Sequence, residues 1–363
     1  MDTLDQDVIP IILGYASPST YVTLIQTCSK FRRMKRTFIK GDIVEDSLSC
    51  DKSDLFKYLS LLGFDININV MCIVAMHGNL NMLKSIYDFG YGIDEIIYAS
   101  AARWGHLHIL EWLREKKCWR NSSACSNAAQ GGHLNVLIWL HESDCPWDTK
   151  TCSNAASEGH LDILKYAHEN GCHWGPMTCG YATRGGHLEV LKYLHENGCP
   201  WSEYTCSIAA QGGHLEVLKY LHENGCPWNA YACSEAAKEG HLEILKWLHE
   251  MGCPWNEDTC KEAAKRGHLE VLKYAHENGC PWDEFTCSNA ALKGHLDVLK
   301  YAHENGCPWG KNTGHHAAVE GHLEILKYIH ENGGPWNASV IYSLLKDDHP
   351  HIINWIKSLN LAV

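Results

Sequence analysis

Residues 253–279, CPWNEDTCKEAAKRGHLEVLKYAHENG, decide the fold because the chain repeats this pattern in register. The Gly-His pair of this unit recurs every 27 residues, nine times, from Gly105-His106 to Gly321-His322. A fixed period of about 20–50 residues is typical of proteins built from stacked repeats, in which each unit packs only on its neighbours. The period therefore predicts a solenoid, a class that offers an extended binding surface and rarely carries a reaction centre.

Each unit is predicted to be an antiparallel pair of helices, here called helix A and helix B. In the quoted unit Asn256 is the expected N-cap of helix A, and Gly267 is expected to end it. Helix B then begins near His268 and ends at Gly279. The face of helix A that packs on its neighbours carries small side chains: Cys260, Ala263 and Ala264. The fold class is thus all-α, and the histidines of the Gly-His pairs are expected to form hydrogen bonds in the turn between the helices.

The repeat pattern divides the chain into four expected parts. Residues 78–347 hold the repeats, and residues 41–77 form a degenerate capping repeat or linker. Residues 348–363 keep the phase and are expected to end the stack with a capping helix. Residues 1–40 break the period and are predicted to form a small helical module of their own.

The composition of the chain argues against nucleic acid and membrane as partners. A formal net charge of −12 argues against general binding of nucleic acid, which depends on contacts from Lys and Arg to phosphates. No stretch approaches the ~20 apolar residues that a membrane-spanning helix needs, so we expect no membrane partner. The acidic first residues lack the basic region of a secretory signal. These features favour the cytoplasm, with the nucleus as a second location.

The 18 cysteines fall mainly at two fixed phases of the repeat, as at Cys145 and Cys152. Equivalent cysteines of neighbouring repeats are expected about 10 Å apart, whereas a disulfide needs Cα atoms within roughly 7 Å. We therefore expect reduced, buried thiols and no cofactor. An alternative is a metal-binding repeat protein, because each unit offers His-x3-Cys-x6-Cys, as in His276, Cys280 and Cys287. No arrangement typical of catalysis stands out, so the chain is not expected to be an enzyme.

The recurring T-C-S-N-A-A-x-x-G-H-L-E-V-L-K-Y-L-H-E-N-G-C resembles the ankyrin repeat, whose unit carries T-P-L-H-x-A-A-x-x-G-H. Cysteine stands where that family has proline, for example at Cys152 and Cys260. Ankyrin units have about 33 residues, and these have 27. The missing residues fall between Cys253 and Thr259, where the family builds a β-hairpin finger. The resemblance therefore implies ankyrin-like helix pairs joined by tight loops without long fingers.

Recognition of a target is expected where the repeats differ from one another. The resemblance to ankyrin domains places these varying positions of helix A in a binding groove. Tyr204, Tyr231 and Phe285 share one phase and would form a broken aromatic row, although ordinary half-buried helix starts would look the same. The recurring Pro-Trp tryptophans, such as Trp255, are expected to form a buried ladder, the alternative being exposed binding residues. The predicted groove residues are Met177, Tyr181, Tyr204, Ile208, Tyr231, Glu235, Asp258, Glu262 and Phe285.

Residues 1–40 resemble the F-box, whose pattern runs roughly L-P-x-D-V-x-x-x-I-L-x-Y-L-S. Asp5 stands where proline is usual and Ala16 where leucine is usual. The resemblance implies docking onto a Skp1-like adaptor of a cullin ubiquitin ligase; the alternative is a helical cap on the solenoid. The residues that would contact the adaptor are Leu4, Val8, Ile9, Ile12, Leu13, Pro18 and Leu24.

Together these features indicate a non-enzymatic adaptor that serves as substrate receptor of a Skp1-cullin-F-box-type ubiquitin ligase. The repeats would hold an unknown protein target. An F-box before numerous short ankyrin-like units is similar to proteins of giant amoeba-infecting DNA viruses, which would place the chain in a host cytoplasm. A plain ankyrin-repeat scaffold and the metal-binding repeat protein remain the alternatives.

Overall fold

The computed structural model describes residues 68–88, 90–117, 122–345 and 348–359, and its contacts divide the chain into two units, residues 1–175 and 176–363. The part of the chain that the structure describes contains helices and no strand, which confirms an all-α fold. The predicted module over residues 1–40 lies outside the described residues. Helix α6, which ends at Met76, stands in the helix A position before Gly78.

The helices of the two units alternate between the A and B positions. The first unit contains α6 (Ile68–Met76), α7 (Leu80–Asp88), α8 (Glu95–Arg103), α9 (Leu107–Glu115), α10 (Ser122–Gly131), α11 (Leu134–Glu142), α12 (Thr149–Glu158) and α13 (Leu161–Glu169). The second unit begins with α14 (Thr178–Arg184), α15 (Leu188–Glu196), α16 (Glu203–Gln211), α17 (Leu215–Glu223), α18 (Ala230–Glu239), α19 (Leu242–Glu250) and α20 (Glu257–Arg266). It continues with α21 (Leu269–Glu277), α22 (Glu284–Lys293), α23 (Leu296–Glu304), α24 (Thr313–Val319), α25 (Leu323–Glu331), α26 (Ala338–Leu345) and α27 (Pro350–Ser358).

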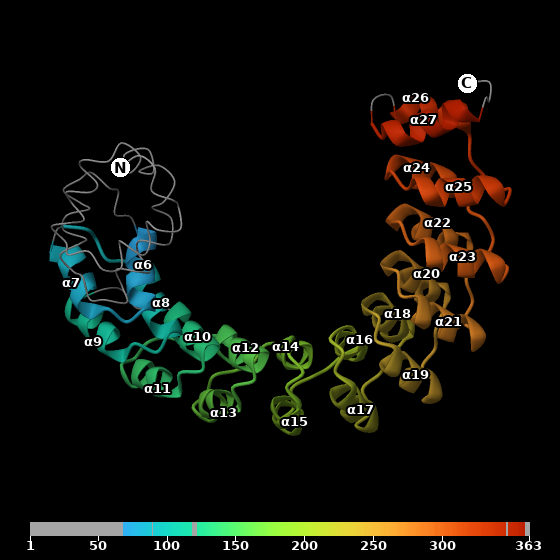
Figure 1. Ribbon diagram of the computed structural model, residues 1–363. Helices are drawn as coiled ribbons and strands as arrows, with labels where there is room; N and C mark the ends of the chain where they lie inside the picture. Colours follow the sequence, from blue (N-terminus) through green and yellow to red (C-terminus); the bar gives the residue numbers. More distant parts are fainter. Residues whose placement is uncertain (1–67, 89, 118–121, 346–347, 360–363) are drawn as a thin grey trace, which may run out of the picture. The chain divides into compact units, whose positions relative to one another are not determined.

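In each unit the helices pack in two rows. In the second unit α16, α18, α20 and α22 contact one another in order, and α19, α21 and α23 follow one another in the second row (Figure 1). The small side chains of helix A allow this close approach: Cys260, Ala263 and Ala264 are fully buried. Helix B supplies the larger apolar groups, such as Leu272, whose burial contributes roughly 1.5–3 kcal/mol. Neither helix of a pair could bury both faces alone, so the stack is the folding unit.

The predicted start of helix A is confirmed at its caps. The side chain of Asn256 accepts a hydrogen bond from the amide of Asp258, and Asp283 does the same for Phe285. Where Gly310 takes this place, α24 begins only at Thr313 and has 7 residues, whereas α20 and α22 have 10. A glycine has no side chain to accept from the first amides, and the helix starts two residues later than its equivalent α22.

Within each unit the Gly-His pair joins one repeat to the next. Gly240 ends α18 in the left-handed conformation, at φ +78°, and a Cβ there would lie 2.7 Å from Cε1 of His268 in the next repeat. The same ring places Nε2 3.0 Å from the carbonyl oxygen of Lys238, in the last turn of α18. That carbonyl has no partner within its own helix. The histidine therefore completes the end of the preceding helix A, and glycine leaves room for its ring.

This contact recurs along both units. Because a carbonyl only accepts, Nε2 carries the proton and donates it. The equivalent distances from Nε2 to the carbonyl oxygen are 2.8 Å for His106 and Met76, 3.0 Å for His214 and Arg184, 3.1 Å for His241 and Gln211, and 2.9 Å for His349 and Val319. The hydrogen-bonding role predicted for these histidines is confirmed, and the acceptor lies in the neighbouring repeat.

The effect on stability of the ring contact at Gly240 can be measured separately from the effect of its backbone conformation. Gly252 has the same φ, +76°, but nothing within 4 Å of an added Cβ. We expect Gly252→Ala to lower the free energy of unfolding by about 1–2 kcal/mol, the cost of left-handed backbone. Gly240→Ala should cost more, because the ring of His268 must also move. Denaturant unfolding measures both losses.

A double variant tests whether His268 causes the difference. In the background of His268→Ala, Gly240→Ala should cost no more than Gly252→Ala does. An undiminished excess cost would show that the ring does not occupy this space.

The histidine contacts also predict a pH dependence. Burial, the larger effect, lowers the pKa of His133, although its hydrogen bond to the backbone of Arg103 acts in the opposite direction. The unfolded chain then binds the proton more readily, so this contribution to stability is present above about pH 6.5 and is lost as the pH falls through the folded pKa. Unfolding measured between about pH 7.5 and 5 should show a steeper loss for the unmodified chain than for His133→Gln. Equal slopes would contradict this.

Candidate protein-binding face

The predicted groove residues lie on the side of helix A that does not pack against neighbouring helices. They form two rows in the second unit, and we call the two rows together the helix A face. The outer row, at the start of each helix A, contains Met177, Tyr204, Tyr231, Asp258 and Phe285. The inner row, one turn further on, contains Tyr181, Ile208, Glu235 and Glu262.

The outer row exposes large apolar side chains. Met177, Tyr204, Tyr231 and Phe285 have between 54% and 58% of their surface in contact with solvent. The ring centroids of Tyr204 and Tyr231 lie 6.4 Å apart, so these two tyrosines are neighbours across two repeats. The aromatic row is interrupted by Asp258, one repeat before Phe285. The rings are thus available to a partner instead of being part of the core.

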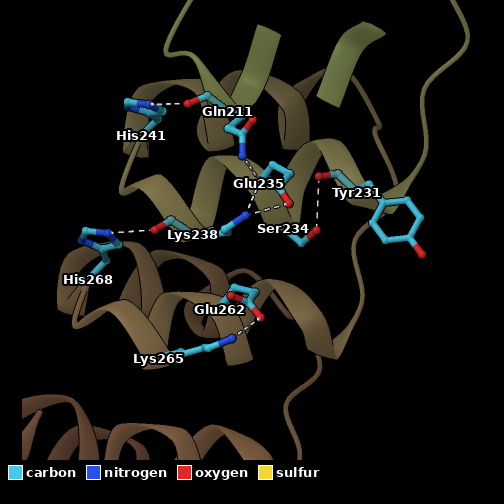
Figure 2. A network of polar contacts seen from close by, with 9 residues as sticks. All are labelled: Gln211, Tyr231, Ser234, Glu235, Lys238, His241, Glu262, Lys265 and His268. Atoms are coloured by element: carbon cyan, nitrogen blue, oxygen red, sulfur yellow. Dashed lines mark hydrogen bonds and ion pairs between the residues drawn. The ribbon is translucent and has the colours of Figure 1, made fainter. Parts of the chain in front are cut away.

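In the inner row Ile208, Glu235 and Glu262 are half-buried and Tyr181 is exposed, and the two acids form polar contacts. Glu235 accepts hydrogen bonds from Lys238, at 2.9 Å, and from Gln211 of the preceding repeat, at 2.8 Å (Figure 2). The hydrogen bond to Glu235 raises the pKa of Lys238. Figure 2 also shows Tyr231 at the opposite end of α18 from Lys238, pointing away from these contacts. These contacts hold the carboxylate of Glu235 in place beside the exposed rings.

A second ion pair reaches the aromatic row. Asp258 pairs with Lys261, and the hydrogen bond between them raises the pKa of Lys261. The Nζ of Lys261 lies 6.0 Å from the ring centroid of Phe285. Lys238 and Lys261 were not among the predicted site residues, although their i,i+3 spacing to an acid could have indicated them. Gln211 gave no such signal, because its acid belongs to the next repeat.

A cleft lies at the end of the face, between α24 and α26. It has a volume of about 600 Å³. Asn312 and His316, which line it, occupy the outer-row and inner-row positions of their repeat. Trp336 and Ile341 from the following turn and helix line it too. In the repeat after Phe285, the residues at the outer-row and inner-row positions therefore line a cleft.

No disulfide links the cysteines of the described residues. Within a repeat the thiol of helix A lies against the cysteine that follows helix B, as Cys260 does against Cys280. That contact and burial raise the pKa of Cys260, and the thiol of Cys280 donates to the carbonyl of Asn256, at 3.3 Å. Such protonated, buried thiols serve as small packing groups.

The histidine of the suspected metal motif contacts a tryptophan. The ring of His276 stacks on Trp282, with centroids 3.6 Å apart. Among the described residues no group of three or more His, Cys, Asp or Glu side chains is placed to hold a metal ion. A zinc site needs about four converging ligands, so these repeats do not fit one.

The tryptophans differ from the prediction of a buried ladder, which is wrong. Trp255 is half-buried: one face stacks on His249, 4.0 Å away, and its edge meets Tyr274 of the next repeat, 6.5 Å away. The short linker folds back on the end of helix B, so the ring covers that end and keeps one side in solvent. These rings link consecutive repeats on the helix B side.

The described helices define a stack of short helix pairs with one exposed, variable face, and the family comparisons agree with this class. Models of ankyrin repeats match residues 179–259 (three copies) and residues 152–200 and 260–303 (many copies). The chain therefore contains ankyrin repeats over residues 152–303. No curated protein matches it.

A similar solved structure is the crystal structure of the human ASB11 ankyrin repeat domain. It is 22% identical, with a TM-score of 0.37, over 43% of this chain and 83% of that chain. No described helix is both long and apolar enough to cross a membrane. The predicted adaptor-contacting residues lie outside the described residues: Leu4, Val8, Ile9, Ile12, Leu13, Pro18 and Leu24.

The exposure of the outer row predicts its effect on stability. Replacing Tyr204 and Tyr231 together by Ala should change the free energy of unfolding by less than about 1 kcal/mol, because surface substitutions usually stay within about 0.5 kcal/mol each. Leu245→Ala, in the buried face of α19, should cost about 2–5 kcal/mol. Denaturant unfolding compares the two. A loss for the tyrosines similar to that for Leu245 would show that they belong to the core.

Proposed function

We propose that this chain is the substrate receptor of a Skp1-cullin-F-box-type ubiquitin ligase, with the target protein held by the helix A face. The observation that carries the binding role is the outer row, where Met177, Tyr204, Tyr231 and Phe285 stand exposed on four of five successive A helices. Exposed apolar groups rimmed by polar residues mark interaction sites, and tyrosines are favoured anchors at interfaces. The F-box-like pattern of residues 1–40 supports the link to an adaptor.

The stack suits this role because it presents the rows on a rigid support. His241 and His268 each bind the preceding helix A, so the ends of these neighbouring helices hold a set distance. Variable side chains can then change from repeat to repeat without changing the backbone. A ligand on this face would be bound at several repeats at once, which gives affinity through many moderate contacts.

The proposed receptor transfers no group itself. A target held at the repeats, with the adaptor at residues 1–40, would meet the ligase at a high effective concentration. The chain would act in the cytoplasm, or in a host cytoplasm if a virus encodes it, with the nucleus as a second location.

A plain ankyrin-repeat scaffold is the second candidate. The observation that favours it is the extent of the family matches, which fall between residues 152 and 303 and leave residues 1–40 unmatched. Such a scaffold would use the same helix A face and recruit no ligase.

A pull-down with a purified Skp1-type adaptor distinguishes the two candidates. The full chain should retain the adaptor, and Leu13→Asp should lose it, because a carboxylate would be buried in the apolar contact. Thr3→Asp adds the same charge nearby and should still bind. Circular dichroism checks that the variants keep their helices. Absence of adaptor binding by the unmodified chain would contradict the receptor role and leave the scaffold.

A further inference from the structure

We infer that the helix A face recognises an extended, arginine-rich segment of a partner protein. This inference rests on the proposed function, because it names the kind of target that the same face would hold. Three features of the face carry it: exposed rings, carboxylates next to them, and a cation already placed at one ring.

The rings offer flat, accessible surfaces to a planar cation. Tyr204 and Tyr231 are 57% and 55% exposed, with centroids 6.4 Å apart and planes inclined by 33°. Phe285, two repeats after Tyr231, is 54% exposed. An arginine guanidinium stacks on such rings and is attracted by their π electrons. The row therefore provides consecutive sites for the same kind of group.

Carboxylates share the first turn of the helix with Tyr204 and with Phe285, whereas the first turn of α18, which carries Tyr231, has none. The first turns of α16, α20 and α22 carry Glu203, Glu257, Asp258 and Glu284, whereas no Lys or Arg lies in these first turns. The basic residues gather at the other ends, in the last turns of α18, α20 and α22. Acids at a helix start are favoured by the helix dipole, which explains the carboxylates but not the large exposed rings of Tyr204 and Phe285 that follow Glu203 and Glu284. Complementarity to a cationic partner accounts for both.

The face contains its own example of the proposed contact. Lys261 pairs with Asp258 while its Nζ lies 6.0 Å from the ring centroid of Phe285. A cation is thus bound between a carboxylate of one repeat and a ring of the next. In α16 Glu203 directly precedes Tyr204 in the first turn, and no described Lys or Arg lies over either tyrosine ring. A partner's arginine would supply the missing cation there.

Geometry favours an extended segment of polypeptide. Neighbouring helices pack about 8–10 Å apart, and an extended chain advances roughly 3.3 Å per residue. Arginines at about every third position would therefore meet successive repeats. Arginine is preferred to lysine because its planar group can stack on a ring and bind a carboxylate at the same time.

The test uses the full chain and synthetic peptides of about 15 residues, with arginine at every third position between glycine and serine. Calorimetry or fluorescence anisotropy at low salt should show saturable binding. Tyr204→Ala with Tyr231→Ala should weaken binding at least about tenfold, equal to about 1.4 kcal/mol. Replacing Glu203 and Glu284 by Gln should weaken it several-fold and reduce its dependence on salt.

Matched controls separate recognition from general charge attraction. Glu216→Gln removes one charge from helix B, where Glu216 pairs with Lys219, and should leave binding unchanged. The peptide with lysine should bind several-fold more weakly, and the peptide with glutamate should not bind. Equal binding of the arginine and lysine peptides, unchanged binding by the tyrosine variant, or no saturable binding would each overturn the inference. The adaptor pull-down depends on residues 1–40, so its outcome is independent of this one.

Discussion

The contact between the glycine of one repeat and the histidine of the next is the constraint on which the rest of the structure depends. His268 donates to the carbonyl of Lys238 and fills the space that Gly240 leaves open. One ring thereby completes a helix end and sets how closely two repeats approach. Helix A can then be short and lined with alanine and cysteine, because its neighbours on both sides are fixed.

The same constraint leaves the helix A face free to vary. The packed side of each helix A is nearly identical from repeat to repeat, whereas the exposed side changes from Tyr204 and Tyr231 to Asp258 and Phe285. Recognition therefore depends on a few side chains held by a uniform support. The carboxylates of Glu203 and Glu284 and the aromatic row lie at the same helix starts. This face therefore matches a cationic protein segment better than it matches nucleic acid.

Much of this arrangement could be predicted from the sequence. The period predicted the helix pairs, Asn256 predicted a helix start, and Gly267 predicted a helix end. The partner of each histidine could not be predicted, because the pair reads as one turn whereas its contact lies in the neighbouring repeat. The hydrogen bond from Gln211 to Glu235 could not be predicted either, because it also joins two repeats. Trp255 was wrongly expected in the core, because spacing does not show that the linker folds back onto His249.

Nuclear magnetic resonance of the histidine ring nitrogens tests the central claim most directly. For His214, His241 and His268 the account predicts a proton on Nε2 that exchanges slowly with solvent, since each is donated to a carbonyl of the preceding repeat. A proton on Nδ1, or exchange as fast as that of an exposed histidine, would contradict it.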